Sequence, residues 1–458
     1  METIHILHTN DLHSHFEYWP QIRRFLLEKR ALLEAENEAV YVVDIGDFVD
    51  RSHSFTEATN GKGNIMFLNE AHYDAVTIGN NEGITMSKED LSSLYDDATF
   101  DVIVGNVREP NGKLPQWARA STVYTTSKGT KVGLIGATAY YDLFYGALGW
   151  NVEEAKARLI AEAENLKEDV DILICLSHLG IYEDRKLAAL CPSIDVILGA
   201  HTHHILPEGE WINDTLMAAT GKYGQFVGYV TVDIDEETKS IVQQTATLVR
   251  SSDLPASRED KQYIQQQIEA GKVALLERVF YNENPLKQNL FGESELASFF
   301  GRALLHYTNA DCALFNAGIF LGSLEEGWVT KEQLHKILPH PINVCTIELT
   351  GEQLYEVYEQ SFSEGLPSIK VTGLGFRGTI MGNLIRERLY KNRHGVLFAG
   401  NREVRPTETY RLATLDMFTF GFFFPQFKTY PKQYYVPELI RDVFGQYGQF
   451  VNESTTRS

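Results

Sequence analysis

The sequence predicts an α/β domain rich in parallel β-sheet, followed by a smaller α+β domain. In the first half of the chain, short runs rich in Val and Ile alternate with helical stretches, the order typical of parallel sheets covered by helices. The chain has 458 residues, more than one compact core normally holds, so at least two domains are expected.

Apolar runs of the first domain are interpreted as strands buried on both faces, because they are short, lack alternation and end in glycine or a polar residue. They are "TIHILHT", "AVYVVDIGD", "AVTIG", "FDVIVGN", "KVGLIGA", "DILICLSH" and "DVILGAHTH". Helices are expected at "WPQIRRFLLEKRALLEAE", "GNIMFLNEAHYDA" and "EEAKARLIAEAENLKED".

The first domain is expected to span residues 1–255, because "SSDLPASRED" is a polar break that contains proline. A helix is expected at "EDKQYIQQQIEAGKVALLERV", which has helical periodicity and good helix formers. Residues 282–458 mix helices such as "ESELASFFGRALLHYT" with strands such as "INVCTIELT", an α+β pattern. The tail "VNESTTRS" is expected to be disordered.

Five of the strands end in side chains that bind metal ions. The donors are Asp11, His13, Asp47, Asn80, His178, His201 and His203. The carboxyl ends of parallel strands meet at one edge of a sheet, where the sites of such domains lie. The set contains oxygen and imidazole donors but no sulfur, which suits Zn, Mn, Fe, Ni or Co. Seven donors with one bridging carboxylate fit two metal ions, an arrangement used to hydrolyse phosphate esters. The alternative for any single donor is a structural polar residue.

The formal net charge of -21 disfavours nucleic-acid polymers and anionic membranes as partners. A small phosphorylated substrate would also be repelled unless bound metal ions inverted the local charge. No apolar run approaches the roughly 20 residues of a membrane helix, and the first residues do not resemble a secretory signal. The four cysteines are widely spaced without a C-x-x-C motif, so buried reduced thiols and a cytoplasmic location are expected.

The order of the motifs is specific. "NDLHSH", "GDFVDR", "GNNE", "SHLG" and "GAHTHH" together resemble the calcineurin-like metallophosphoesterases, and within them the bacterial 5'-nucleotidase group, which includes cyclic phosphodiesterases and UDP-sugar hydrolases. The stretch "NADCALFNAGIFLGSLEEGWVTKEQLHKILPHPINVCTIELTGEQLYEVYEQS" is similar to the C-terminal nucleotidase domain. The resemblance implies a four-layer αββα sandwich, a linker helix within residues 256–281 and a substrate-binding domain at 282–458.

The resemblance also implies a role for each donor and a mechanism. The first metal ion would be held by Asp11, His13 and His203, the second by Asn80, His178 and His201, and both by the bridging Asp47. An activated water would attack phosphorus in line with the leaving group while the ions neutralise the phosphate oxygens.

Two positions depart from the catalytic pattern of the family. Asn81 stands where the family has the histidine of G-N-H-E, which is credited with assisting the leaving group, and Ile84 replaces the aspartate that orients it. Asn81 can donate a hydrogen bond but cannot titrate. Proton transfer by a positioned group is worth about 10²–10⁴-fold, so weak activity on poor leaving groups is expected.

The predicted substrate-binding residues lie in the second domain. "FNAGIFLGS" keeps Asn316 and Gly318 of the family pattern, but Phe320 replaces an arginine that helps bind the nucleotide, and Arg377 is a candidate to compensate. Phe424, within "DMFTFGFFFPQF", is a candidate to stack on a nucleobase, with packing in the core as the alternative.

The sequence is therefore interpreted as a metal-dependent phosphohydrolase of nucleotides or related small phosphate esters. One alternative, suggested by Asn81, Ile84 and Phe320, is a metal- and nucleotide-binding protein of the same fold with little hydrolysis. A second alternative, suggested by "GDFVDR", is a phosphoprotein phosphatase.

Overall fold

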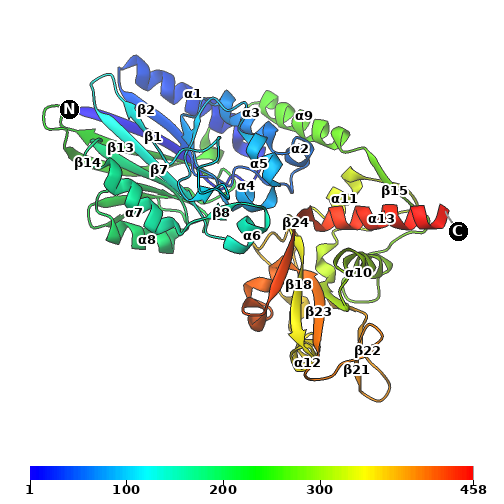
Figure 1. Ribbon diagram of the computed structural model, residues 1–458. Helices are drawn as coiled ribbons and strands as arrows, with labels where there is room; N and C mark the ends of the chain where they lie inside the picture. Colours follow the sequence, from blue (N-terminus) through cyan, green and yellow to red (C-terminus); the bar gives the residue numbers. More distant parts are fainter. Residues whose placement is uncertain (457–458) are drawn as a thin grey trace. The chain divides into compact units, whose positions relative to one another are not determined.

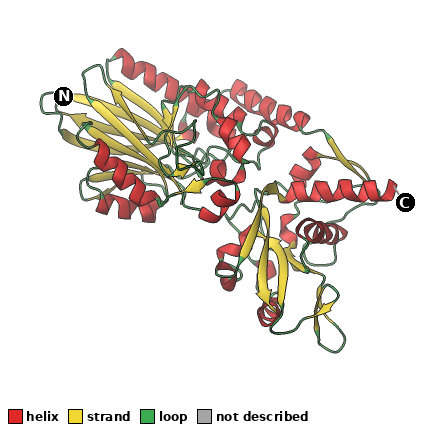
Figure 2. Cartoon of the chain, in the orientation of Figure 1, coloured by secondary structure: helices red, strands yellow, loops and turns green. Residues whose placement is uncertain are grey.

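The computed structural model describes residues 1–456, which divide into two compact units. The first unit ends at Gly271 and the second begins at Lys272, so the division falls within helix α9 (Arg258–Ala274). Each unit has its own sheets (Figures 1 and 2) and its own apolar core. Two domains are thus confirmed, whereas boundaries at 255 and 282 remain predictions. Among the residues described, no helix has the length and apolar character needed to span a membrane.

The first unit contains two six-stranded sheets, each with four consecutive parallel strands, which are the last four in the order of the first sheet and the four central strands in the second. The first sheet has the order β14 (Ile241–Arg250), β13 (Phe226–Ile234), β1 (Glu2–Thr9), β2 (Ala39–Asp44), β3 (Ala75–Val76), β4 (Asp101–Val102). The second has the order β11 (Glu210–Ile212), β12 (Thr215–Ala218), β10 (Val196–Gly199), β9 (Ile172–His178), β7 (Lys131–Thr138), β6 (Ser121–Thr125). All seven predicted strands are present, although β3 and β4 have only two residues each.

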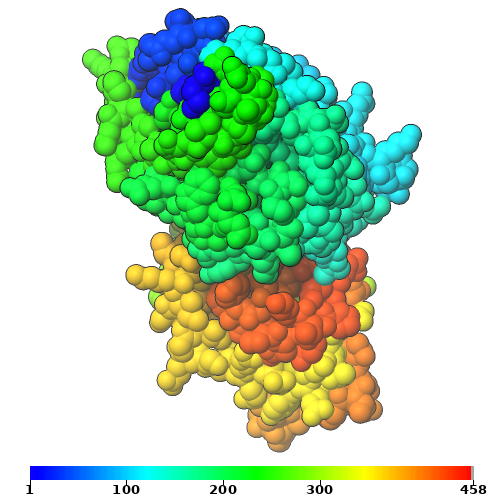
Figure 3. Space-filling view, turned by 90° about the vertical axis from the view of Figure 1, so that its left-hand side faces the viewer, coloured from blue at the N-terminus to red at the C-terminus, as the bar shows by residue number. Residues whose placement is uncertain are grey.

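The two ends of this unit's chain come together in the first sheet. Strand β1 is paired on one side with the late antiparallel strand β13 and on the other with the parallel β2. Figure 3 shows the same arrangement at the surface, where the blue N-terminal residues lie against green residues from the end of the unit. Ile6 of β1 and Ile174 of β9 belong to the apolar core between the sheets.

Helices cover the outer faces of both sheets. Helix α1 (Trp19–Ala35) packs on the first sheet, and helices α7 (Ala155–Leu166) and α8 (Ile181–Leu190) pack on the second, where Leu159 and Leu187 contact the sheet core. The order helix, sheet, sheet, helix confirms the predicted four-layer αββα sandwich. The remaining short elements are α2 (Ser54–Ala58), α3 (Lys62–Glu70), α4 (Asn80–Thr85), α5 (Lys88–Leu94), β5 (Val107–Arg108), α6 (Asp142–Ala147) and β8 (Asn151–Val152).

The second unit is α+β, as predicted. Its main sheet has the order β19 (Leu384–Glu387), β16 (Cys312–Asn316), β23 (Thr409–Leu415), β18 (Asn343–Thr350), β24 (Lys432–Leu439). Its smaller strands are β15 (Arg278–Asn282), β17 (Gly327–Thr330), β20 (Leu389–Lys391), β21 (Leu397–Ala399) and β22 (Arg402–Glu403). Its helices are α10 (Glu295–Thr308), α11 (Lys331–Ile337), α12 (Gly351–Gln360) and α13 (Ile440–Thr456).

The expectation of a disordered tail from residue 451 is wrong for the part described, because α13 continues to Thr456. The side chain of Asn452 donates to the carbonyl of Tyr281 and accepts from its amide, at 2.9 and 2.6 Å, which fixes the last turns of the helix against β15. Residues 457 and 458 lie outside the described part of the chain.

Candidate metal centre

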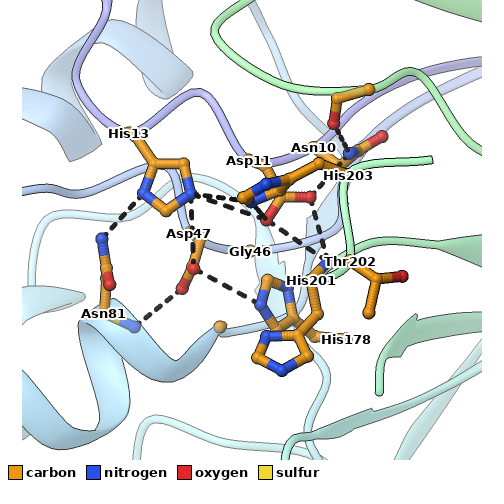
Figure 4. A network of polar contacts seen from close by, with 12 residues as sticks. Asn10, Asp11, His13, Gly46, Asp47, Asn81, His178, His201, Thr202 and His203 are labelled. Atoms are coloured by element: carbon orange, nitrogen blue, oxygen red, sulfur yellow. Dashed lines mark hydrogen bonds and ion pairs between the residues drawn. The ribbon is translucent and has the colours of Figure 1, made fainter. Parts of the chain in front are cut away.

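The predicted donors gather at the carboxyl ends of strands from both sheets of the first unit. Strand β1 leads into Asp11 and His13, β2 into Asp47, and β9 ends in His178. Asn80 follows β3, and His201 and His203 follow β10. Figure 4 shows Asp11, His13, Asp47 and His178 directed toward a common centre.

The distances between donor atoms are those of ligands around a shared cation. Asp11 Oδ1 lies 3.4 Å from His203 Nε2 and 3.7 Å from His13 Nε2. The two imidazole nitrogens are 3.3 Å apart. Ligands bound at about 2.1 Å in tetrahedral geometry stand roughly 3.4 Å apart. Most of these contacts are too long for good hydrogen bonds but have the spacing of a coordination shell.

Asp47 lies between two groups of donors. Its Oδ2 atom is 3.6 Å from His13 Nε2 and 3.5 Å from His178 Nε2. Asp11, His13 and His203 form one compact set of potential ligand atoms, and Asp11, Asp47 and His178 form another. The two sets share Asp11, and each has enough donor atoms to hold a cation.

Two buried atoms of the cluster have no hydrogen-bond partner. They are Asn80 Oδ1 and His178 Nε2. Because His178 Nδ1 donates to the carbonyl of Ile45 at 2.6 Å, the lone pair of a neutral imidazole is on Nε2, facing Asp47. Buried polar atoms are rarely left unsatisfied, so the donors fit a metal centre.

Electrostatics also favours a cation at this position. Burial lowers the pKa of His178, but the carboxylates of Asp47 and Asp11 outweigh burial and raise this pKa to about 10. The two carboxylates therefore stabilise positive charge beside them, and a metal ion bound there would supply it.

Most of the donor residues have an unusual backbone conformation. Five of the seven are in the left-handed region, and their φ angles are 49° at Asp11, 50° at His13, 52° at Asp47, 69° at His201 and 57° at His203. Residues other than glycine rarely adopt positive φ, and such strain clusters at functional sites. The sharp bends turn each side chain toward the cluster immediately after its strand or loop.

Glu82 is a positioning residue that the sequence interpretation missed. Its buried carboxylate accepts hydrogen bonds from the backbone amides of Asp47, Val49 and Gly79 at 3.0, 2.8 and 2.9 Å. Burial, together with the charge of Asp47, raises the pKa of Glu82 to about 7. The available signal was the position of Glu82 three residues after the N-cap Gly79, where a capping-box glutamate occurs.

We expect Glu82→Ala to lower the free energy of unfolding of the metal-free protein by about 3 kcal/mol or more. The change leaves three buried amides without an acceptor, and each such loss costs about 1–3 kcal/mol. Urea denaturation measures the effect, with Glu89→Ala, a change at an exposed residue of helix α5, as the matched control. A loss no larger than that of the control would show that Glu82 does not hold the Asp47 loop.

The buried side chain of Asn81 contacts two of the donor residues, Asn80 and His13. Its Nδ2 atom lies 2.9 Å from the carbonyl of Val49, which can only accept, and this fixes which amide atom is nitrogen. Its Oδ1 accepts from Asn80 Nδ2 at 3.3 Å, which leaves Asn80 Oδ1 for the cluster. The other hydrogen of Nδ2 is directed at His13 Nδ1, also at 2.9 Å.

Metal binding would alter the contact between Asn81 and His13. An imidazole that binds a cation through Nε2 carries its proton on Nδ1. The nearby acceptor for that proton is Asp50 Oδ2, 3.6 Å from His13 Nδ1. The Asn81 amide hydrogen that now points at His13 would then be free to form another hydrogen bond. Asn81 could thus donate one hydrogen bond, but an amide cannot transfer its proton.

In the second unit, three of the predicted substrate residues lie in adjoining segments. Asn316 Nδ2 and the amide of Gly318 both donate to the carbonyl of Met381, at 3.0 and 2.8 Å. A Cβ atom on Gly318 would lie 2.0 Å from the carbonyl oxygen of Ile380, so the close approach requires glycine. Arg377 is half-buried in the same loop as Met381.

The sequence interpretation also missed His340, which joins these segments. Its Nε2 donates to the carbonyl of Ile319 at 2.7 Å, and its Nδ1 accepts from the amide of Arg377 at 2.8 Å. Burial lowers the pKa of His340 to about 3, so the ring is neutral and can both donate and accept.

Phe320 and Phe424 require a correction. Phe320 is 1% exposed and packs edge-to-face on Phe300, and Phe424 is fully buried and stacks on Phe427 at 4.8 Å. Both rings belong to the apolar core of the second unit rather than to a surface that a substrate can reach. The exposed aromatic residue of that segment is Phe422, at 74%.

Comparison with known proteins is consistent with this geometry. Residues 4–204 match the calcineurin-like phosphoesterase family, and residues 270–428 match the 5'-nucleotidase C-terminal domain. The chain is 38% identical over 453 residues to the metallophosphoesterase YunD of Bacillus subtilis, covering 96% of this chain and 98% of that protein. It is 23% identical to human 5'-nucleotidase, covering 78% and 71% of the two chains. The structure of the NAD nucleotidase NadN of Haemophilus influenzae has the same fold, with a TM-score of 0.67 at 14% identity over 98% and 96% of the chains.

Proposed function

Since the chain belongs to the calcineurin-like metallophosphoesterase family and carries a 5'-nucleotidase C-terminal domain, we propose that it hydrolyses nucleotides or related small phosphate esters at a centre of two divalent metal ions. Membership of the family makes it a phosphoric ester hydrolase. The observation that supports the two-metal proposal is the cluster of seven donors, four of them buried, in which the buried atoms Asn80 Oδ1 and His178 Nε2 have no hydrogen-bond partner.

Each donor has a proposed place. Asp11, His13 and His203 would hold one ion, and Asn80, His178 and His201 the other, with Asp47 between them. His201 contacts Tyr141 through Nε2 at 3.4 Å, which leaves its Nδ1 for an ion. Bound divalent ions supply neutralisation of the phosphoryl oxygens and a lowered pKa for water.

The residues around the donors have supporting roles in this proposal. Glu82 holds the loop that carries Asp47, and Asn81 fixes the orientation of Asn80. Because Asn81 cannot transfer a proton, the leaving group must depart as a stable anion or take its proton from another source.

We expect the purified, metal-free protein to take up two ions per chain when it is reconstituted with Mn, Zn, Co or Ni. Hydrolysis should then be detected in a panel of nucleoside monophosphates, cyclic diesters, nucleotide sugars and aryl phosphates. Elemental analysis gives the stoichiometry, and the panel gives the substrate class. One bound ion, or none, in the presence of excess metal would contradict the dinuclear proposal.

The same panel tests the alternative of a binding protein with little hydrolysis, which the substitution at Asn81 favours. That alternative predicts two bound metals and measurable nucleotide affinity without turnover of any ester. The complete donor set supports hydrolysis, because a centre used only for binding does not need all seven ligands. The side chain of Arg51, from "GDFVDR", forms an ion pair with Glu57 at 2.8 Å, so its position does not favour a phosphoprotein phosphatase.

We also propose that the protein works in a reducing compartment such as the cytoplasm. Cys175, Cys191, Cys312 and Cys345 are buried and unpaired. Mass spectrometry of the native protein should therefore find four free thiols, and its melting temperature should not change with millimolar reductant. A disulfide under native conditions would contradict this location.

A further inference from the structure

A cavity of about 260 Å³ lies beside the metal centre, wholly within the first unit. It is lined by the segments that follow β7 and β9 and by the first turns of α7 and α8. Strands β7 and β9 are parallel neighbours, so their carboxyl ends meet at this point. Ligands of open α/β sheets bind outside such strand ends.

The cavity and the metal centre share a wall. His201, a proposed metal ligand, lines the cavity, and Figure 4 shows the same residue beside His178 in the cluster. Strand β7 ends without a metal ligand, and the small buried residue Ala139 follows it. A larger side chain in place of Ala139 would occupy part of the cavity beside the metal centre, and alanine leaves that space open.

The lining combines apolar, aromatic and charged groups. Ala139, Ala155 and Leu179 provide apolar surface, and Tyr140, which is 51% exposed, provides an aromatic ring. Lys156 lies between two carboxylates, in contact with Glu183 and 3.5 Å from Glu154. The three charged groups sum to one negative charge.

We propose that this cavity receives the leaving group of the ester, and that the leaving group is an uncharged polyhydroxylated one, a sugar or another polyol. The assignment rests on the proposed phosphohydrolase function. A hydroxyl group both donates and accepts, so it can bond to the ammonium of Lys156 and to the carboxylates beside it. Apolar and aromatic surface accommodates the C–H faces of a sugar ring.

Size and charge argue against a whole nucleoside and against a second phosphate as occupants. Sites for drug-sized ligands have volumes of about 300–1,000 Å³, so this cavity suits a single ring rather than a whole nucleoside. A second phosphate would find the ammonium of Lys156 already held by the carboxylates of Glu183 and Glu154, and the lining contains no other Lys or Arg side chain to bind it. The cavity would therefore select monoesters of sugars or polyols, or the sugar end of a larger ester.

The test compares Lys156→Met with Lys186→Met. Both lysines pair with Glu183, but Lys186 is on the exposed side of α8 and does not line the cavity. Hydrolysis of glucose 6-phosphate and of p-nitrophenyl phosphate is measured with the metal-loaded protein. Because Asn81 cannot protonate the departing alkoxide, glucose 6-phosphate should be the slower of the two substrates in every variant, and only the change in the ratio reports on the cavity. We expect Lys156→Met to lower the ratio of the two kcat/KM values by about 10- to 100-fold, as for loss of a charged hydrogen bond. Lys186→Met should leave the ratio unchanged.

A second measurement does not depend on turnover. Saturation-transfer NMR with free glucose, ribose and glycerol should show binding to the wild-type protein and to Lys186→Met, and weaker binding to Lys156→Met. Tyr140→Ala, a change at an exposed position, should weaken the same signals. Elemental analysis should find equal metal content in all variants.

The outcomes separate the two proposals. Polyol binding without hydrolysis of any phosphate ester would contradict the proposed function but not the assignment of the cavity. Hydrolysis with no polyol binding, or with equal losses on both substrates in Lys156→Met, would overturn the cavity assignment alone. Saturation transfer to choline or ethanolamine, but not to the polyols, would show that the cavity binds a cationic group and would overturn the proposal of an uncharged leaving group.

Discussion

Replacing Asp47 by alanine is expected to remove both metal ions and to lower phosphate ester hydrolysis by about 10³-fold or more. Asp47 Oδ2 is the atom that lies between His13 and His178, at 3.6 and 3.5 Å, so it serves both groups of donors. Loss of the metals forfeits several kcal/mol of charge stabilisation in the transition state, and each 1.36 kcal/mol corresponds to tenfold in rate.

Two further variants sharpen this experiment. Asp47→Asn removes the charge but keeps the shape of the side chain. It also keeps an oxygen that can accept the hydrogen bond that the backbone amide of Asn81 donates to Asp47 at 2.7 Å in the wild-type protein. Asp253→Ala changes an exposed aspartate outside the centre and should keep both metals and full activity. The rise in melting temperature on adding metal should persist in Asp253→Ala and disappear in Asp47→Ala. Two bound ions in Asp47→Ala would refute the bridging role.

The second large effect concerns the leaving group. The protein should hydrolyse aryl phosphates and the pyrophosphate bonds of nucleotide sugars at least about 100-fold faster than nucleoside monophosphates, the scale of a missing general acid. Asn81 can offer at most one hydrogen bond to a departing oxygen, because its other amide hydrogen is bonded to Val49. Rates on a series of aryl phosphates of graded leaving-group pKa would give the dependence directly.

The double variant Asn81→His with Ile84→Asp tests the cause. The two positions are three residues apart on α4, where side chains are neighbours, so the aspartate can orient the new imidazole. We expect a gain on nucleoside monophosphates below the roughly 10⁴-fold ceiling of general acid catalysis. Ile84→Asp alone is the control and should give no gain. If the double variant binds two metals and still shows no gain, Asn81 does not limit the reaction.

The sequence was most informative where a short apolar run ends in a polar residue. Parallel strands buried on both faces leave few places for Asp11 or His178 other than the carboxyl edge, so pattern alone predicted where the donors lie. The same reasoning overestimated β3, where only Ala75 and Val76 pair with β2. The carboxylate of Glu82 binds the amide of Gly79 as well as amides of the loop that carries Asp47. This tertiary contact holds the chain after Val76 in the loop, and strand propensity does not predict it.

Other features depend on tertiary contacts that a single sequence does not contain. His340 acts through two backbone groups 21 and 37 residues away along the chain, so no local pattern indicates it. Phe320 and Phe424 fit an aromatic binding surface and an apolar core equally well as sequence. Their depth is decided by α10 and the main sheet, which enclose them together with Phe300 and Phe427.

The left-handed backbone at five of the donors has a consequence for engineering this protein. Glycine, or asparagine, would relieve backbone strain at positions such as His13, His201 and His203, each of which costs about 1–3 kcal/mol as it stands. A selection for thermal stability of the metal-free protein would therefore enrich substitutions at the residues proposed to hold the metal ions. At each of these positions, a substitution that stabilises the metal-free fold would remove a proposed metal ligand. Stabilised variants should therefore be selected with metal present.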